Sequence, residues 1–68
     1  MTDETKAGTG YMVTLDDTRT VSAFPHENGS VVFEFVNMGV RTHIKLSRQA
    51  IEAVTYLYYK LQTDGFTA

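Results

Sequence analysis

Residues 11–15 and 40–46 alternate between apolar and polar side chains with a period of two, which is typical of strands that bury one face, and residues 30–36 are enriched in β-branched and aromatic residues. Turn-forming residues separate the predicted strands at Asp16-Asp17-Thr18, at Asn28-Gly29 and at Asn37-Met38-Gly39. Asn28-Gly29 is a strong signal for a type I′ hairpin turn, because both residues tolerate a positive φ. The pattern predicts four antiparallel strands, at residues 11–15, 19–24, 30–36 and 40–46.

After Leu46 the apolar period changes to that of an α-helix. Ser47 is a preferred N-cap residue, and Leu46 can pack against Ile51 at the fourth helical position. Asp64-Gly65 is a typical helix end, so we predict a helix over residues 48–62. At about 100° per residue, one side of this helix collects an apolar stripe. The apolar stripe consists of Ala50, Ile51, Val54, Leu57, Tyr58 and Leu61.

Strand register follows from the turns, because a one-residue slip exchanges the two faces of a strand. Pairing Asn37 with Val40 places Phe33 opposite Ile44 and gathers apolar residues on one surface, which we call the inner face. Its predicted members are Tyr11, Val13, Leu15, Phe24, Val31, Phe33, Phe35, Ile44 and Leu46. We expect the apolar stripe of the helix to cover this face.

The second strand is the uncertain element in this arrangement. A regular hairpin at Asn28-Gly29 places Phe24 on the inner face and turns Val21 and Ala23 outward. A bulge at Pro25, which cannot donate a ladder hydrogen bond, would reverse these positions. The sequence leaves both arrangements open.

Residues 1–10 contain two glycines and three threonines without apolar periodicity, so we expect a flexible N-terminal arm there. A chain of 68 residues has room for one hydrophobic core. We therefore predict a single α+β domain over residues 11–66. Its expected architecture is a four-stranded antiparallel β-meander (ββββα) with one C-terminal helix packed on one sheet face.

The composition contains no cysteine, which excludes disulfides and favours a reducing compartment. Residues 1–6 are acidic and polar where a signal peptide would be basic and then apolar, and no apolar run approaches membrane-spanning length. We therefore expect a cytoplasmic protein with no membrane partner. The formal net charge of -2 is too small to indicate electrostatic capture of nucleic acid.

Candidate catalytic groups are few. His26 lies in a predicted turn and His43 on a predicted strand, and no spacing brings together a nucleophile, a base and an orienting group. Two distant histidines without cysteine fall short of a zinc site, and no glycine-rich phosphate loop is present in the sequence. Ser47 is explained by helix capping. We expect no enzyme activity, no metal site and no cofactor.

The side of the predicted helix opposite the apolar stripe carries two tyrosines, Tyr56 and Tyr59. Tyrosine is enriched at protein interfaces because it combines a large contact area with few rotatable bonds and a hydroxyl group. A single exposed aromatic residue is ordinary, but a pair spaced i, i+3 on the outward side is less so. We predict that this helix face binds a protein partner. It consists of Arg48, Glu52, Thr55, Tyr56, Tyr59 and Lys60.

One helix can cover only one side of the sheet, so the outer face is expected to stay open. Its predicted binding residues are Arg19, Val32, Glu34, Val36, Arg41, His43 and Lys45. Such a half-apolar face suits homodimerisation or partner contact, while a cross-strand pair of Glu34 with His43 fits an ordinary solvated face. Its basic residues make a nucleic-acid-binding or regulatory function the alternative, although the stacking aromatics of single-strand binders are not expected there.

A tiny acidic domain with one sheet, one helix and no catalytic set is similar to many small accessory proteins of phages and mobile elements. That similarity implies a protein that acts by occupying a surface of a host protein. We therefore predict a small non-catalytic protein-binding module, an inhibitor or adaptor for a host protein complex. Homodimerisation is a further expectation, because a core of this size supplies little net stability.

Overall fold

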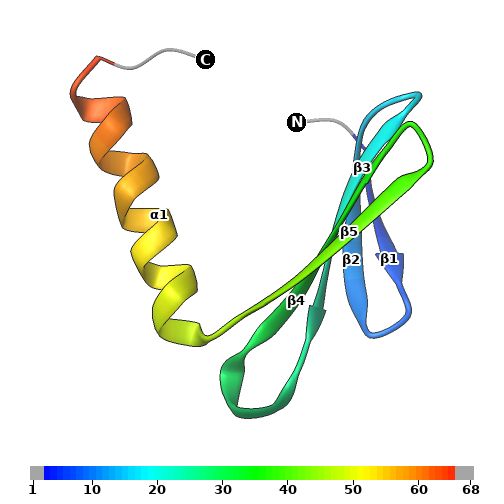
Figure 1. Ribbon diagram of the computed structural model, residues 1–68, viewed down its shortest axis with the longest axis horizontal. Helices are drawn as coiled ribbons and strands as arrows, with labels where there is room; N and C mark the ends of the chain where they lie inside the picture. Colours follow the sequence, from blue (N-terminus) through cyan, green and yellow to red (C-terminus); the bar gives the residue numbers. More distant parts are fainter. Residues whose placement is uncertain (1–2, 66–68) are drawn as a thin grey trace.

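The computed structural model describes residues 3–65 of the chain. Within these residues, five strands form one antiparallel sheet in the order β1-β2-β3-β4-β5. The helix α1 follows the last strand and stands apart from the sheet (Figure 1). In chain order the elements are β1 (Asp3–Ala7), β2 (Gly10–Asp16), β3 (Arg19–Pro25), the short 3₁₀ helix η1 (Glu27–Gly29), β4 (Val31–Asn37), β5 (Val40–Leu46) and α1 (Arg48–Thr63). The predicted α+β class is confirmed.

β1 occupies residues that the sequence predicts to be a flexible arm, so the described sheet has one strand more than the predicted four. Lys6 of β1 pairs with Tyr11 of β2, and the turn that joins these strands contains Gly8, which adopts a φ of 59°. The Lys6 ammonium lies 4.7 Å from the centroid of the Tyr11 ring, a cation–π contact. β1 satisfies backbone groups at the edge of β2, and its charged side chains discourage further pairing. Residues 1 and 2 of the predicted arm and residue 66 of the predicted domain lie outside the described residues.

The hairpin of β4 and β5 has the predicted register. The pairing runs from Asn37 opposite Val40 to Val31 opposite Leu46 without interruption. Both central residues of the turn, 38 and 39, adopt a positive φ, as a two-residue hairpin turn requires. The inner-face positions that the sequence assigns to these two strands are therefore confirmed.

The hairpin of β3 and β4 contains the predicted turn but has a shifted register. Asn28-Gly29 adopts positive φ values, and the Ser30 N–H donates to the Glu27 carbonyl at 3.1 Å. The Ser30 carbonyl, however, accepts from the His26 N–H at 2.9 Å, so two residues of one strand lie opposite Ser30. This is a bulge directly after Pro25, and it shifts β3 by one residue.

The bulge exchanges the two faces of β3 relative to a regular hairpin. Val21 and Ala23 lie on the inner face, opposite Phe35 and Phe33, while Phe24 lies on the outer face. The prediction of Phe24 on the inner face is therefore wrong, and the bulged alternative is the one found. The inner face carries the apolar residues Tyr11, Val13, Val21, Ala23, Val31, Phe33, Phe35, Val40, Ile44 and Leu46, whereas the predicted member Leu15 lies where the register of β2 and β3 shifts.

On the outer face the ring of Phe24 lies against Gly10 of the neighbouring strand. A Cβ atom at Gly10 would overlap the carbonyl oxygen of Ala23 and would come within 2.9 Å of Cδ1 of Phe24. Gly10 and Ser22 are the buried positions among the described residues. The aromatic ring thus fills the space that a side chain at residue 10 would take, which fixes the register of β2 and β3.

The helix α1 begins as predicted and ends one residue later than predicted. The Oγ atom of Ser47 accepts from the Ala50 N–H at 3.1 Å, so Ser47 is the N-cap. The helix extends to Thr63, and Gly65 follows with a φ of 90°. Local capping signals therefore fix both ends of the helix.

The helix does not pack on the inner face, so this part of the predicted architecture is wrong. α1 meets the sheet mainly at β5, and the sheet and helix form the two arms of a V (Figure 1). Ser47 is the one residue between β5 and α1, and from there the helix diverges from the inner face.

Neither sheet face has a covering layer. Among residues 3–65 no hydrophobic side chain is fully buried, and the buried side chain is the polar Ser22, 4% exposed. Burial of apolar surface is the main favourable term in folding, and this chain by itself achieves little of it. Within the same residues, no helix combines the length and apolar character needed to cross a lipid bilayer.

Candidate binding surfaces

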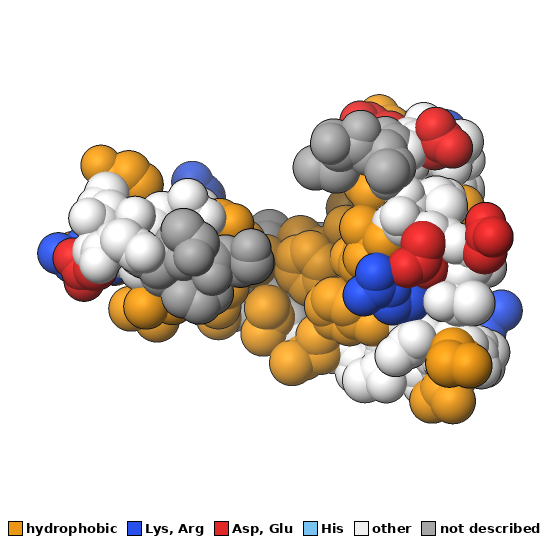
Figure 2. Space-filling view, turned by 90° about the horizontal axis from the view of Figure 1, so that it is seen from above, with side chains coloured by type: hydrophobic (Ala, Val, Ile, Leu, Met, Phe, Trp, Pro, Cys, Tyr) orange, Lys and Arg blue, Asp and Glu red, His pale blue; other side chains and the backbone are white. Residues whose placement is uncertain are grey.

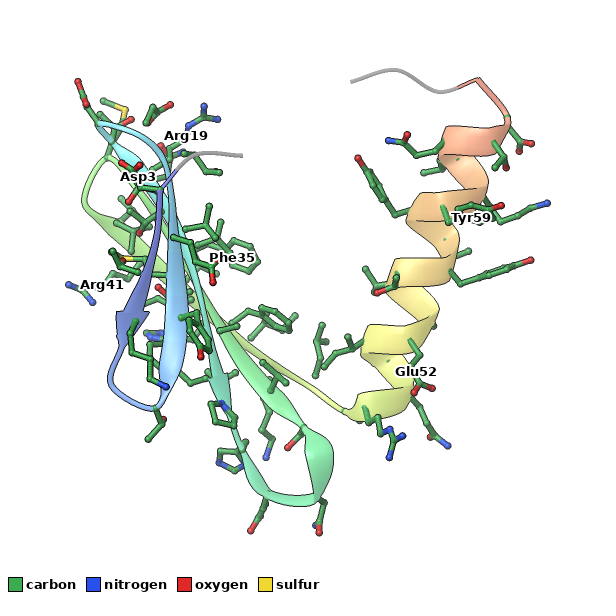
Figure 3. The ribbon with its side chains drawn as sticks, turned by 180° about the vertical axis from the view of Figure 1, so that it is seen from behind. Asp3, Arg19, Phe35, Arg41, Glu52 and Tyr59 are labelled. Carbon is green, nitrogen blue, oxygen red and sulfur yellow. The ribbon has the colours of Figure 1, made fainter. Side chains whose placement is uncertain are left out.

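The helix face of α1 is exposed along its whole length, including all six residues that the sequence assigns to it. Arg48 and Glu52 lie one turn apart and form an ion pair, with 3.4 Å between Nε and Oε2. Tyr56 and Tyr59 are 59% and 62% exposed. Figure 3 shows Glu52 on the side of α1 that is turned away from the sheet. The helix therefore brings the predicted residues together, and their role in binding stays a prediction.

The apolar stripe is a second exposed surface on α1, which sequence reasoning assigned to the core. Leu57 and Tyr58 are 58% and 56% exposed. The Tyr58 hydroxyl accepts a hydrogen bond from Nε2 of Gln62 at 2.7 Å, so its polar end is satisfied while its ring stays accessible. Hydrophobic side chains gather in the space between helix and sheet (Figure 2). The apolar period identifies this stripe, but it does not say in which direction the helix leaves the strand.

Glu34 lies at the centre of the outer face. Its Oε2 atom is 3.0 Å from both Nη1 of Arg41 and Nε2 of His43. The Glu34 side chain is 15% exposed, and the residue paired with it on β3 is the buried Ser22. The predicted cross-strand pair of Glu34 with His43 is therefore present, and the charge of Arg41 is partly neutralised within the protein.

Six of the seven predicted outer-face residues share that face, namely Val32, Glu34, Val36, Arg41, His43 and Lys45. Phe24 joins them because of the bulge, so the expectation that no aromatic residue lies there is wrong. Phe24 is in one cross-strand row with Val32 and Lys45. Its ring is partly buried against Gly10 and is not a fully open stacking platform.

Arg19 does not belong to the outer face, because the shifted register pairs it with Asn37 on the inner side. Its guanidinium binds Asp16, with Nε 2.8 Å from Oδ2, and the Thr18 N–H donates to Oδ1 at 2.9 Å. The hydrogen bond from Arg19, followed by that from the Thr18 backbone, holds the pKa of Asp16 well below its usual range. The Asp16 carboxylate in turn raises the pKa of Arg19.

Among residues 3–65 no three His, Asp or Glu side chains lie close enough to hold a metal ion, and no pocket is present. No protein-family model matches the chain, and no curated protein or solved structure is significantly similar to it. The function is therefore inferred from the geometry of the exposed surfaces.

Proposed function

We propose that this chain is a non-catalytic protein-binding module whose helix face contacts a protein partner. The observation that carries the proposal is the position of Tyr56 and Tyr59, exposed on the side of a projecting helix that the apolar stripe does not use. Whatever covers the stripe leaves both rings accessible. Two tyrosines on a regular helix offer a large contact area at a small cost in conformational entropy.

The charged residues around the tyrosines suit the rim of such an interface. Arg48 and Glu52 are paired with each other, and Lys60 lies one residue beyond Tyr59. Exposed ion pairs contribute little to stability, so we expect the rings to supply most of the binding energy. The charges would instead steer the approach and select the partner.

The setting that fits this proposal is the cytoplasm, because a protein without cysteine does not depend on an oxidising compartment for disulfides. A module without catalytic groups acts by occupying a surface, as an inhibitor or adaptor of a host protein complex does. A phage-type accessory role is part of this proposal.

The test is the double variant Tyr56→Ala/Tyr59→Ala. The parent chain is used to capture partners from a lysate of the native host, and a purified partner is then titrated by calorimetry. Interface hot spots contribute about 2 kcal/mol or more each, so we expect about 1,000-fold weaker binding when both tyrosines are hot spots and at least about 30-fold when one of them is. Far-UV circular dichroism should show the helix retained.

The matched control is Arg41→Ala/Lys45→Ala on the outer face, which should change the affinity by less than about threefold. Equal affinities of the parent and the tyrosine variant would refute the proposed role of the helix face. If only the outer-face variant binds the partner more weakly, the binding site lies on the sheet instead.

Nucleic-acid binding by the outer face is the second candidate, and the row of Phe24, Val32 and Lys45 favours it. Against it, Arg19 lies on the other side and Arg41 is paired with Glu34. If oligonucleotides bind there, Lys45→Ala should reduce the slope of log affinity against log salt by about 1. Filter binding at several salt concentrations measures this slope, and affinity without salt dependence would exclude the candidate.

A further inference from the structure

The chain exposes more surface than a compact monomer of its size. Its accessible surface is 5497 Å², whereas a folded monomer of 7.6 kDa exposes about 4,300 Å², an excess of about 1,200 Å². Its radius of gyration is 13.3 Å, against about 11 Å for a compact domain of this length. A large surface that a compact fold would bury is therefore open.

The open surface is the inside of the V between sheet and helix. On the inner face Phe35 and Ile44 are 42% and 46% exposed, and on α1 Val54 and Leu61 are at least half exposed. Figure 3 shows Phe35 on the side of the sheet that faces α1, and Glu52 on the far side of the helix. The inner face and the apolar stripe therefore look toward one another without packing.

The surfaces inside the V are uncharged at their centres. One cross-strand row of the inner face reads Tyr11, Ala23, Phe33 and Ile44, and the charged residues of this face lie at its periphery, with Lys6 on the edge strand and Arg19 at the first position of β3. An occupant of this face must present an apolar surface about as long as the strands. Strands of 7 residues are about 23 Å long, and the 16-residue α1 is about 24 Å long.

We propose that a second copy of this chain fills the V, so that each inner face is covered by the apolar stripe of the partner's α1. From the one-residue linker at Ser47 the helix diverges from its own inner face, and short hinges of this kind favour exchange of an element between copies. A two-fold axis closes the arrangement with two identical contacts. The helix face stays outside the exchanged contact, so this inference does not depend on the proposed function.

The area agrees with this arrangement. If the excess accessible surface of about 1,200 Å² is covered on each of two chains, the dimer buries about 2,400 Å² in total. This lies within the range of about 2,000–5,000 Å² for obligate homodimers. The contact is formed by the most apolar surfaces of the chain, as obligate interfaces are. Folding and association are therefore coupled, and the unfolding midpoint should rise with protein concentration.

The first test is the solution mass of the full chain by light scattering or sedimentation, with a mass of twice 7.6 kDa expected at micromolar concentration. The second is isotope-filtered NOESY on labelled and unlabelled chains refolded together. Cross-peaks between chains are expected from the methyl groups of Val54 and Leu57 to the rings of Phe33 and Phe35. A monomeric mass, or cross-peaks within one chain only, would overturn the proposal.

Variants separate this contact from others. Leu57→Asp should weaken dimerisation at least about 100-fold, because it buries an unpaired charge, whereas Thr55→Asp on the other side of α1 should leave the dimer intact. If Leu57→Asp fails to fold, the NOESY pattern of the parent decides alone. A dimer whose contacts between chains involve Val32 and Val36 of the outer face would also refute helix exchange. Tyr56→Ala/Tyr59→Ala should remain dimeric whether or not it loses a protein partner.

Discussion

Replacing Gly10 by alanine tests the close approach of β2 and β3 beneath Phe24. The added Cβ would overlap the carbonyl oxygen of Ala23 and would come within 2.9 Å of Cδ1 of Phe24. In an ordinary strand position the same change stabilises by about 0.5–1 kcal/mol, because alanine loses less backbone entropy on folding than glycine. At Gly10 we expect the opposite sign.

The magnitude follows from what has to move. The Phe24 ring can rotate, but the Ala23 carbonyl belongs to the backbone of β3, so the two strands must separate locally. Overpacking costs about 1–3 kcal/mol, and each weakened ladder hydrogen bond adds about 1 kcal/mol. We expect the free energy of unfolding to fall by about 2–3 kcal/mol in total. In a domain of this length, that corresponds to a decrease in Tm of roughly 10–20 °C.

The assay is thermal and urea unfolding followed by far-UV circular dichroism at one protein concentration, because association shifts the midpoint. The control is Gly8→Asn, at a turn position with a φ of 59° and no atom within 4 Å of a built Cβ. Asparagine tolerates this conformation, so the change should stay within about 0.5 kcal/mol. Gly10→Ala combined with Phe24→Ala should not recover the loss, since the carbonyl contact remains. A Gly10→Ala variant as stable as the parent would refute the reasoning.

Three further predictions concern polar contacts. Ser47→Ala removes the N-cap acceptor and should lower the free energy of unfolding by about 1 kcal/mol, measured by urea unfolding. Arg19→Gln should raise the pKa of Asp16 toward its usual range, read from the Asp16 carboxyl carbon in an NMR titration. Because the folded-state pKa is lowered, this pair stabilises the parent above the ordinary carboxyl pKa of about 4, and the stabilisation is lost as pH falls through the folded-state value. Glu34→Ala should cost about 1–2 kcal/mol and Arg41→Ala less than about 1 kcal/mol, because these side chains are 15% and 67% exposed; equal costs in urea unfolding would contradict this.

The parts of the fold that follow from the sequence are those decided within a few residues. Asn37 and Val40 flank a two-residue turn, and their pairing fixes every later pair of β4 and β5. Ser47 and Gly65 mark the ends of α1 by capping chemistry that is independent of tertiary contacts. The helix face was predictable for the same reason, since helical spacing alone places its residues on one side.

The parts that do not follow depend on groups outside the local pattern. The bulge after Pro25 involves one extra residue in a loop whose turn signal is correct, so the turn residues alone cannot reveal it. β1 is polar on both faces and forms because β2 offers an unpaired edge. The position of α1 depends on the direction in which the chain leaves β5 at Ser47, which the apolar period does not record.

The bulge and the short linker act on the same surface. The bulge moves Val21 and Ala23 to the inner face and Phe24 to the outer face, so β3 adds apolar residues to the inner face while Phe24 covers part of the outer face. The face that needs a second layer is therefore the inner one, not the outer face that the sequence indicates for self-association. Because α1 diverges from its own inner face, we expect that layer to come from another molecule. If a second copy supplies it, Tyr56 and Tyr59 are presented twice, and a partner with two matching sites would gain affinity through avidity without any new contact.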